Sequence, residues 1–157
     1  MRAGIGFDAH AFDDARPLVL GGVTIEGARG LAGHSDADVV CHAIGDALLG
    51  AANLGDLGSH FPNGDEWRNA SSIDILVAVQ RMLDAHGYVV SSIDATVLLE
   101  EPRIAPYTDE MRKKIAVALA VDPGIVSVKA TTTDGLGTIG RGEGAACLAV
   151  ALIEARH

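Results

Sequence analysis

Two hydrophobic periods alternate along this chain, and that alternation limits the possible folds more than any other feature of the sequence. Between Ile93 and Leu99, apolar side chains occupy every second position, which is the pattern of a half-buried strand. Residues 39–48 instead place their apolar side chains at helical spacing. Strand-like and helix-like segments follow one another without an internal repeat or an obvious linker. The sequence therefore predicts one domain, residues 1–157, of the α+β class: a two-layer sandwich of helices on one face of a small mixed β-sheet.

The expected elements follow from these periods and from the capping and turn residues between them. Strands are expected at residues 1–8, in a hairpin over 18–25, and at 88–100 and 125–133. Helices are expected at residues 34–52, 71–87, 108–120 and 145–156. Ser35 is the expected N-cap of the first helix, with Asp38 three residues later in a variant of the capping box. Ser71 or Ser72 is expected to cap the second helix.

Charge and composition exclude several classes of protein. The net charge of −9, from 12 basic and 21 acidic residues, argues against broad binding to nucleic acid or to a membrane surface, because basic patches provide that affinity. No apolar run reaches the roughly 18 residues of a membrane span, and no secretory signal is visible. Cys41 and Cys147 lie far apart and form no CxxC motif, which suits a reducing compartment. We expect a cytoplasmic protein, and the charge does not exclude a phosphorylated small molecule as its substrate.

The stretch GFDAH, residues 6–10, places a carboxylate and an imidazole two positions apart. In a strand, the side chains of Asp8 and His10 leave the same face. His42 stands on the first helix, away from the main apolar arc of that helix. Together the three side chains form a ligand set that suits zinc and leaves one coordination position open. The sequence therefore favours an open zinc site, which indicates catalysis more than a structural metal.

Two neighbours qualify this interpretation of His42. Asp38 and Asp46 lie one helical turn on either side of it, so the row on its own also fits a solvent-exposed acidic stripe. If the zinc site exists, these two carboxylates are candidates for orienting the second nitrogen of the imidazole. Cys41 points about 100° away around the helix. It is expected to be a small buried residue and not a fourth ligand.

A glycine-rich segment follows the last expected strand. GLGTIG, residues 135–140, fits the G-x-G-x-x-G pattern, but the chain ends too soon afterwards for the second strand of a dinucleotide fold. The P-loop pattern fails as well, because Arg141-Gly142 stand where lysine and a hydroxyl residue are needed. The segment still offers backbone N–H groups for an anion, the hydroxyls of 131–133, and Asp134 for a hard cation. An ordinary glycine-rich turn after a threonine-containing strand explains the same residues equally well.

Three blocks in this order resemble the signature motifs of the 2-C-methyl-D-erythritol 2,4-cyclodiphosphate synthase family: GFDAHAF, GLAGHSDADVVCHAIGDALLGAANLGDLGSHFP and KATTTDGLGTIGRGEG. The resemblance extends over essentially the whole chain. It implies an enzyme of non-mevalonate isoprenoid biosynthesis that converts 4-diphosphocytidyl-2-C-methyl-D-erythritol 2-phosphate to the cyclic 2,4-diphosphate and releases CMP. It also implies a homotrimer with active sites between adjacent subunits, a zinc ion, and a second divalent ion, Mg²⁺ or Mn²⁺.

The resemblance also implies roles for individual residues. The expected zinc ligands are Asp8, His10 and His42, the second ion lies near Asp134, and the expected catalytic pair is His34 and Thr132. Around the substrate, the resemblance places Asp8, His10, His34, Ser35, Asp56, Leu57, Gly58, Phe61, Asn63, Asp65, Arg103, Ala130, Thr131, Thr132, Thr133, Asp134, Thr138 and Arg141. The cytidine pocket aligns with residues 99–105, and Arg141 with Glu143 would form ion pairs around the threefold axis.

Four positions depart from the family pattern. Asp134 stands where glutamate is usual, so its ion is expected to be held at longer reach, through water. Asn63 replaces a frequent aspartate, Thr138 a frequent phenylalanine, and Arg103 a common lysine. Two other functions stay open from the residues: a zinc-dependent phosphate-ester hydrolase, for which no dedicated base is visible, and a nucleotide-binding module without turnover, which has no need for an open metal site.

Overall fold

A computed structural model describes residues 1–156 of the chain. Its main sheet has five strands in the order β4-β1-β7-β5-β6, and only the β5–β6 pair is parallel among the pairs described. The strands are β1 (Arg2–Asp13), β4 (Gly30–Leu31), β5 (Tyr88–Leu98), β6 (Val126–Thr131) and β7 (Gly144–Ala155). A separate hairpin pairs β2 (Leu18–Leu20) with β3 (Val23–Ile25) across Gly21-Gly22. The predicted hairpin is therefore confirmed, and both turn glycines have positive φ angles.

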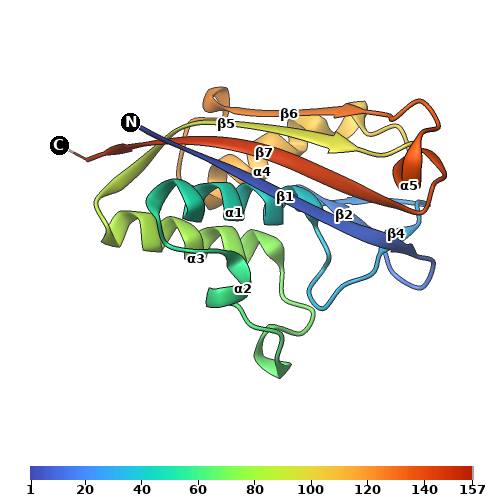
Figure 1. The fold of residues 1–157 in the computed structure, drawn as a ribbon, viewed down its shortest axis with the longest axis horizontal. Helices are drawn as coiled ribbons and strands as arrows, with labels where there is room; N and C mark the ends of the chain where they lie inside the picture. Colours follow the sequence, from blue (N-terminus) through green and yellow to red (C-terminus); the bar gives the residue numbers. More distant parts are fainter. Residues whose placement is uncertain (157) are drawn as a thin grey trace.

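Three helices form the second layer, beneath the long strands β1, β5 and β7 (Figure 1). They are α1 (Val39–Ala52), α3 (Ser72–Ala85) and α4 (Thr108–Ala118). Shorter turns occur at α2 (Leu57–His60), η1 (Asp65–Trp67), η2 (Ala105–Tyr107), η3 (Pro123–Ile125) and α5 (Gly137–Gly140). The core lies between the layers, and the alternating residues from Ile93 to Leu99 are buried in it as predicted. The predicted class, helices packed on a mixed sheet, is confirmed. Within residues 1–156, no helix has the length and apolar character needed to cross a bilayer.

Two glycines of β1 bring this strand unusually close to α1. A Cβ atom on Gly4 would lie 1.9 Å from the carbonyl oxygen of Ala47, and one on Gly6 would lie 1.9 Å from that of Ala43. Both distances are far below van der Waals contact, so only glycine permits this approach. Residues two apart on a strand share a face. The face that carries these two glycines therefore also presents Asp8 directly to α1.

The other face of the sheet carries apolar side chains that no helix within residues 1–156 covers. Ile5 pairs with Val150, and Phe7 pairs with Leu148, across the β1–β7 ladder. These four side chains are exposed, with relative exposures of 68%, 44%, 60% and 41%. They form a contiguous patch at the centre of the sheet, which we call the outer patch.

The predicted helix at residues 145–156 is wrong, because this segment forms β7. Alanine-rich sequence suggested a helix. In the structure the side chains of Cys147, Ala149, Ala151 and Ile153 face the core, whereas Leu148 and Val150 face outward. The outward residues are apolar too, so the period of two is hidden in the sequence. Pairing with β1 on one side and β5 on the other stabilises the strand.

The start of the first helix also differs from the prediction. The N-cap is Asp38 and not Ser35, and the helix begins at Val39. The Asp38 carboxylate accepts backbone N–H groups from Val40 and Cys41, and also from Gly21 and Gly22 of the hairpin, at 2.7–3.1 Å. This side chain is fully buried, so the expected exposed acidic stripe does not include it. Burial raises its pKa above the usual value.

Candidate metal centre and substrate pockets

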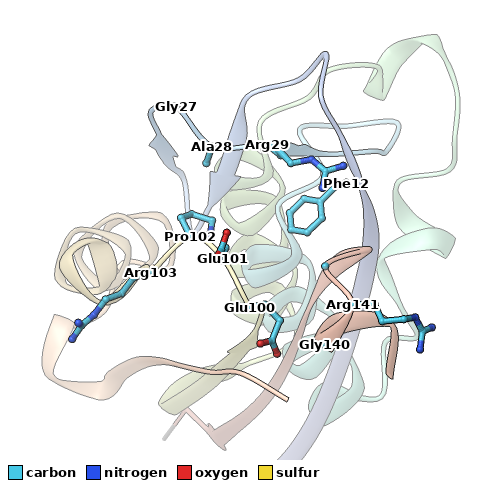
Figure 2. A pocket seen from close by; sticks show the side chains of 11 residues that line it. Phe12, Gly27, Ala28, Arg29, Glu100, Glu101, Pro102, Arg103, Gly140 and Arg141 are labelled. Atoms are coloured by element: carbon cyan, nitrogen blue, oxygen red, sulfur yellow. The ribbon is translucent and has the colours of Figure 1, made fainter. Parts of the chain in front are cut away.

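Two pockets contain most of the residues expected in the site. The larger one, of about 820 Å³, lies at one end of the sheet (Figure 2). It is lined by Phe12, Gly27, Ala28, Arg29, Glu100, Glu101, Pro102, Arg103, Gly140, Arg141 and Gly142. The guanidinium groups of Arg103 and Arg141 extend in opposite directions from it, and that of Arg141 lies 3.0 Å from a carboxylate oxygen of Glu143. This pocket brings together the expected cytidine segment and the expected phosphate arginine, but it contains none of the expected metal ligands Asp8, His10, His42 and Asp134.

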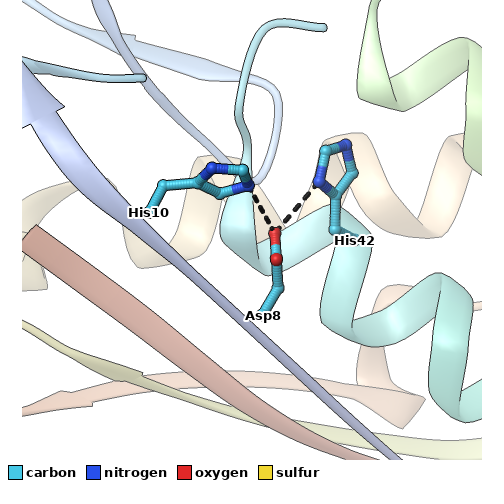
Figure 3. Close-up of side chains that lie close together, drawn as sticks. All are labelled: Asp8, His10 and His42. Atoms are coloured by element: carbon cyan, nitrogen blue, oxygen red, sulfur yellow. Dashed lines mark hydrogen bonds and ion pairs between the residues drawn. The ribbon is translucent and has the colours of Figure 1, made fainter. Parts of the chain in front are cut away.

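Asp8, His10 and His42 converge in the smaller pocket, as the sequence predicted (Figure 3). The Oδ2 atom of Asp8 lies 3.1 Å from Nε2 of His10 and 3.0 Å from Nδ1 of His42. Strand β1 supplies the first two side chains, and helix α1 supplies the third. One ligand atom from each residue lies within 4.8 Å of the other two. The close approach of β1 to α1 is what brings the carboxylate within reach of His42.

The donor set and its dimensions fit a zinc ion. Zinc bonds to imidazole nitrogen and carboxylate oxygen are about 2.0–2.2 Å long, so two ligand atoms of a tetrahedral site lie about 3.3 Å apart. The oxygen–nitrogen distances of 3.0 and 3.1 Å in this cluster are close to that value. The three side chains are partly buried, with relative exposures of 16–23%. Three protein ligands leave the fourth position to a small molecule, which is the arrangement of a catalytic zinc site.

The electrostatics of the cluster are those of a carboxylate held between two imidazoles. Burial alone would raise the pKa of Asp8, but hydrogen bonds with His10 and His42 lower it below its ordinary value. For His42, burial alone would lower the pKa, yet the Asp8 carboxylate raises it above 6.5. A divalent cation bound among these groups would displace the protons that the two imidazoles now share with the Asp8 carboxylate, and would itself neutralise the charge of that carboxylate.

The second nitrogen of His42 has different partners from those expected. Its Nε2 atom lies 2.9 Å from the hydroxyl of Ser72 and 3.2 Å from that of Ser35. Asp46 instead accepts the backbone N–H of Leu57 at 2.8 Å. Asp38 caps α1, as described above. The hypothesis that Asp38 and Asp46 orient His42 is therefore wrong, because the partners of its second nitrogen are two serine hydroxyls.

The smaller pocket, of about 260 Å³, also contains several residues expected to contact substrate. Its lining is Asp8, His10, His34, Ser35, His42, Asp46, Leu57, Gly58, Phe61, Asn63, Trp67 and Ile75. The imidazole Nε2 of His34 lies 2.7 Å from the carbonyl oxygen of Gly64. Phe61 packs edge-on against Trp67, with ring centroids 4.8 Å apart. Beside the pocket, Asp56 caps the short helix α2 by accepting the N–H and the hydroxyl of Ser59 at 2.8 and 2.9 Å.

The residues expected to hold the second ion lie elsewhere. Strand β6 is separated from β1 by two strands, which places the two about 14 Å apart across the sheet. Thr131, Thr132, Thr133 and Asp134 follow or end β6, and they line neither pocket. The Thr132 hydroxyl lies 3.3 Å from a carboxylate oxygen of Asp134, and Glu100 accepts the N–H of Thr133 at 2.7 Å. Ala130, Thr138 and Asp65 also lie outside both pockets.

Sequence reasoning missed three residues near the cluster. Trp67 and Ile75 line the smaller pocket, and Ser72 contacts His42. Ser72 was interpreted only as a possible helix cap. Its role depends on how the start of α3 packs against α1, and no local pattern in the sequence reports that packing. Trp67 is the only tryptophan of the chain and lies in a glycine-rich loop, which was a usable signal.

The fold and this cluster together define an α+β protein with a candidate three-ligand metal centre, and a model of the YgbB family matches residues 1–154. The chain belongs to the YgbB family. A 2-C-methyl-D-erythritol 2,4-cyclodiphosphate synthase of Pelodictyon phaeoclathratiforme is 57% identical, over 98% of each chain. The protein of that name from Moorella thermoacetica is 55% identical, over 98% of this chain and 94% of its own. An IspF from Plasmodium falciparum, solved as a CDP complex, is 30% identical, with a TM-score of 0.88 over 99% of this chain and 97% of its own.

Proposed function

We propose that this chain, acting as a single catalytic domain over residues 1–157, is a cyclising phosphorus–oxygen lyase. It would convert 4-diphosphocytidyl-2-C-methyl-D-erythritol 2-phosphate to 2-C-methyl-D-erythritol 2,4-cyclodiphosphate and CMP. The observation that carries the proposal is the convergence of Asp8, His10 and His42 in a chain more than half identical, over nearly its full length, to proteins named for that product. An open metal site meets the needs of this reaction, which is a transfer between two phosphates.

The proposed reaction depends on positioning the substrate and stabilising its charge more than on a general base. The nucleophile is an oxygen of the substrate's own 2-phosphate, which is already anionic, so no side chain has to remove a proton from it. Catalysis of phosphoryl transfer depends mainly on alignment and on neutralising charge that develops on the phosphates. A bound zinc ion would supply Lewis acidity toward the β-phosphate. His34 in the smaller pocket and Thr132 beside Asp134 would donate hydrogen bonds to the phosphate oxygens on which negative charge develops.

The second divalent ion, Mg²⁺ or Mn²⁺, would bind near Asp134. A carboxylate suits these hard cations, which usually keep several water ligands. The Asp134 carboxylate is exposed and close to the Thr132 hydroxyl, so one ion there would lie beside a proposed catalytic donor. Held there, this ion would help to neutralise the negative charge of the substrate's phosphates. The larger pocket, with Arg103 at the cytidine segment, would receive the nucleoside end.

We propose further that the active protein is a homotrimer with its active sites between subunits. Within one chain the zinc cluster and the Thr132–Asp134 segment lie about 14 Å apart across the sheet, so neighbouring copies would be needed to bring such groups to one substrate. The outer patch supports a copy of this chain as the neighbour, because contiguous exposed apolar surface of this kind marks an interface. Both cysteines are free and buried, which suits the cytoplasm as the place of action.

Phosphorus NMR of the proposed substrate with purified protein tests the function. A cyclic diphosphate together with CMP, formed with Zn²⁺ and Mg²⁺ and absent after chelation, supports the synthase. Linear phosphate products would identify a zinc hydrolase instead. Tight cytidine binding without turnover would identify a nucleotide-binding module. Either of these last two results would overturn the proposal.

A further inference from the structure

A buried serine, Ser72, and a half-buried carboxylate, Asp36, lie behind His42, on the side of the ring that faces away from Asp8. The Ser72 hydroxyl lies 2.9 Å from His42 Nε2 and also contacts Oδ1 of Asp36. The other carboxylate oxygen of Asp36 accepts the backbone N–H of Ser72 at 2.9 Å. We propose that Ser72, held by Asp36, is the positioning residue that fixes the His42 ring for metal binding. This inference rests on the proposed metal-dependent function.

The number of available protons fixes the direction of each hydrogen bond. A serine hydroxyl has one proton, and the contact with the Asp36 carboxylate uses it, because a carboxylate only accepts. The lone pairs of the Ser72 oxygen are therefore left for His42, whose Nε2 must carry a proton and donate it. In the metal-free protein Nδ1 also carries a proton, which it donates to the Asp8 carboxylate, so a metal ion that displaced this proton would meet a ring lone pair on Nδ1. The pair thus selects the tautomer that a metal ion in this cluster requires.

The surroundings make this arrangement rigid. Ser72 is fully buried at the first position of α3, and Asp36 lies in the segment before α1. Backbone hydrogen bonds join the two segments: Asp36 N–H donates to Ala70 at 3.2 Å, and Asn69 N–H donates to His34 at 3.0 Å. The Asp36 carboxylate also stands at the N-terminus of α3, where negative charge is favourable.

Ser35 is a weaker second partner for the same ring nitrogen. Its hydroxyl lies 3.2 Å from Nε2, against 2.9 Å for Ser72, and no carboxylate fixes its proton. Loss of Ser72 would therefore leave the ring with one longer hydrogen bond and more rotational freedom. Removing groups that orient a metal-binding histidine typically costs about 10–100-fold in metal affinity.

The test measures zinc affinity directly, by competition with a chromophoric chelator, in Ser72→Ala and in the matched control Ser71→Ala. Ser71 is the adjacent serine, it is exposed, and its side chain makes no capping hydrogen bond. We expect Ser72→Ala to weaken zinc binding about 10–100-fold and Ser71→Ala to leave it within about threefold of the original. Ser72→Thr, which keeps the hydroxyl, is expected to recover most of the affinity. In the zinc-loaded protein, a slowly exchanging imidazole N–H signal from His42 in a proton NMR spectrum should be lost in Ser72→Ala only.

The outcomes separate this inference from the proposed function. If the unchanged protein binds no zinc, both the positioning role of Ser72 and the proposed zinc-dependent function are overturned. If it binds zinc and catalyses cyclisation while Ser72→Ala binds zinc equally well, only the positioning role is overturned. A purely structural role for Ser72 predicts a lower unfolding midpoint of the metal-free variant with unchanged zinc affinity, and that result would also overturn it. Should Ser72→Ala fail to fold, Asp36→Asn keeps the side-chain size and must weaken zinc binding in the same direction.

Discussion

Replacing Gly6 with alanine should damage the metal centre from a position that touches no ligand. The new Cβ atom would lie 1.9 Å from the carbonyl oxygen of Ala43, whereas ordinary contact begins near 3.4 Å. Strand β1 would have to move about 1.5 Å away from α1 to relieve this clash. The separation of 3.0 Å between Asp8 Oδ2 and His42 Nδ1 would then approach about 4.5 Å, too far for one zinc ion with bonds near 2 Å.

We therefore expect Gly6→Ala to lose at least about 100-fold in zinc affinity and about 1–3 kcal/mol in the free energy of unfolding of the metal-free protein. Chelator competition and urea denaturation measure the two quantities. Gly50→Ala is the matched control, because Gly50 is an exposed residue of α1 with no atom within 4 Å of the added Cβ. It should keep full zinc affinity and gain about 0.5–1 kcal/mol of stability. Wild-type zinc affinity in Gly6→Ala would refute the argument that close packing of β1 on α1 sets the ligand distances.

Three other predictions follow from contacts described above. Asp38→Ala leaves four backbone N–H groups without their acceptor, so the free energy of unfolding by urea should fall by about 3 kcal/mol; a loss below about 1 kcal/mol would contradict that role. The metal-free protein should be most stable between about pH 4 and pH 6.5, measured by thermal unfolding across pH. The lowered pKa of Asp8 contributes stability that is present above its ordinary 3.8 and is lost as pH falls, and the raised pKa of His42 contributes stability that is present below 6.5 and is lost as pH rises. Asp8→Asn should flatten this profile, and an unchanged profile would rule out the pair as its cause. Phe7→Glu places a charge in the outer patch, so light scattering should detect monomers where the unchanged protein forms trimers; trimers that persist would show that the patch is not the interface.

The layered fold was predictable from the sequence because most elements have a clear hydrophobic period. Strand β7 was the exception, since its outward side chains Leu148 and Val150 are as apolar as its inward ones. Such a strand looks like a buried helix until its two neighbours in the sheet are known. If the outer patch is covered by other copies of the chain, the ambiguity has a physical cause, because the surface that conceals the period is itself an interface.

The metal cluster was predictable in composition but not in its support. Asp8 and His10 on one strand face and His42 on a helix are local features, so the residues themselves indicated the ligand set, and the family resemblance implied the same three side chains. The neighbours of His42 on its own helix, Asp38 and Asp46, were plausible supports by spacing alone. In the structure both carboxylates accept backbone N–H groups from other segments. The side chain that contacts the second nitrogen of His42 is instead Ser72, at the start of α3. Contacts of that kind depend on how helices pack and cannot be read from spacing along one helix.

The zinc-edge X-ray absorption spectrum of the zinc-loaded protein, recorded with and without CDP, tests the central claim most directly. The account predicts one zinc ion per chain with nitrogen and oxygen ligands at about 2.0–2.2 Å, two of them imidazoles, and one oxygen ligand that changes when CDP is added. A sulfur ligand near 2.3 Å would contradict it, because Cys41 and Cys147 are placed in the core. A four-coordinate spectrum that CDP leaves unchanged would contradict it as well, because the fourth position would then be closed to substrate.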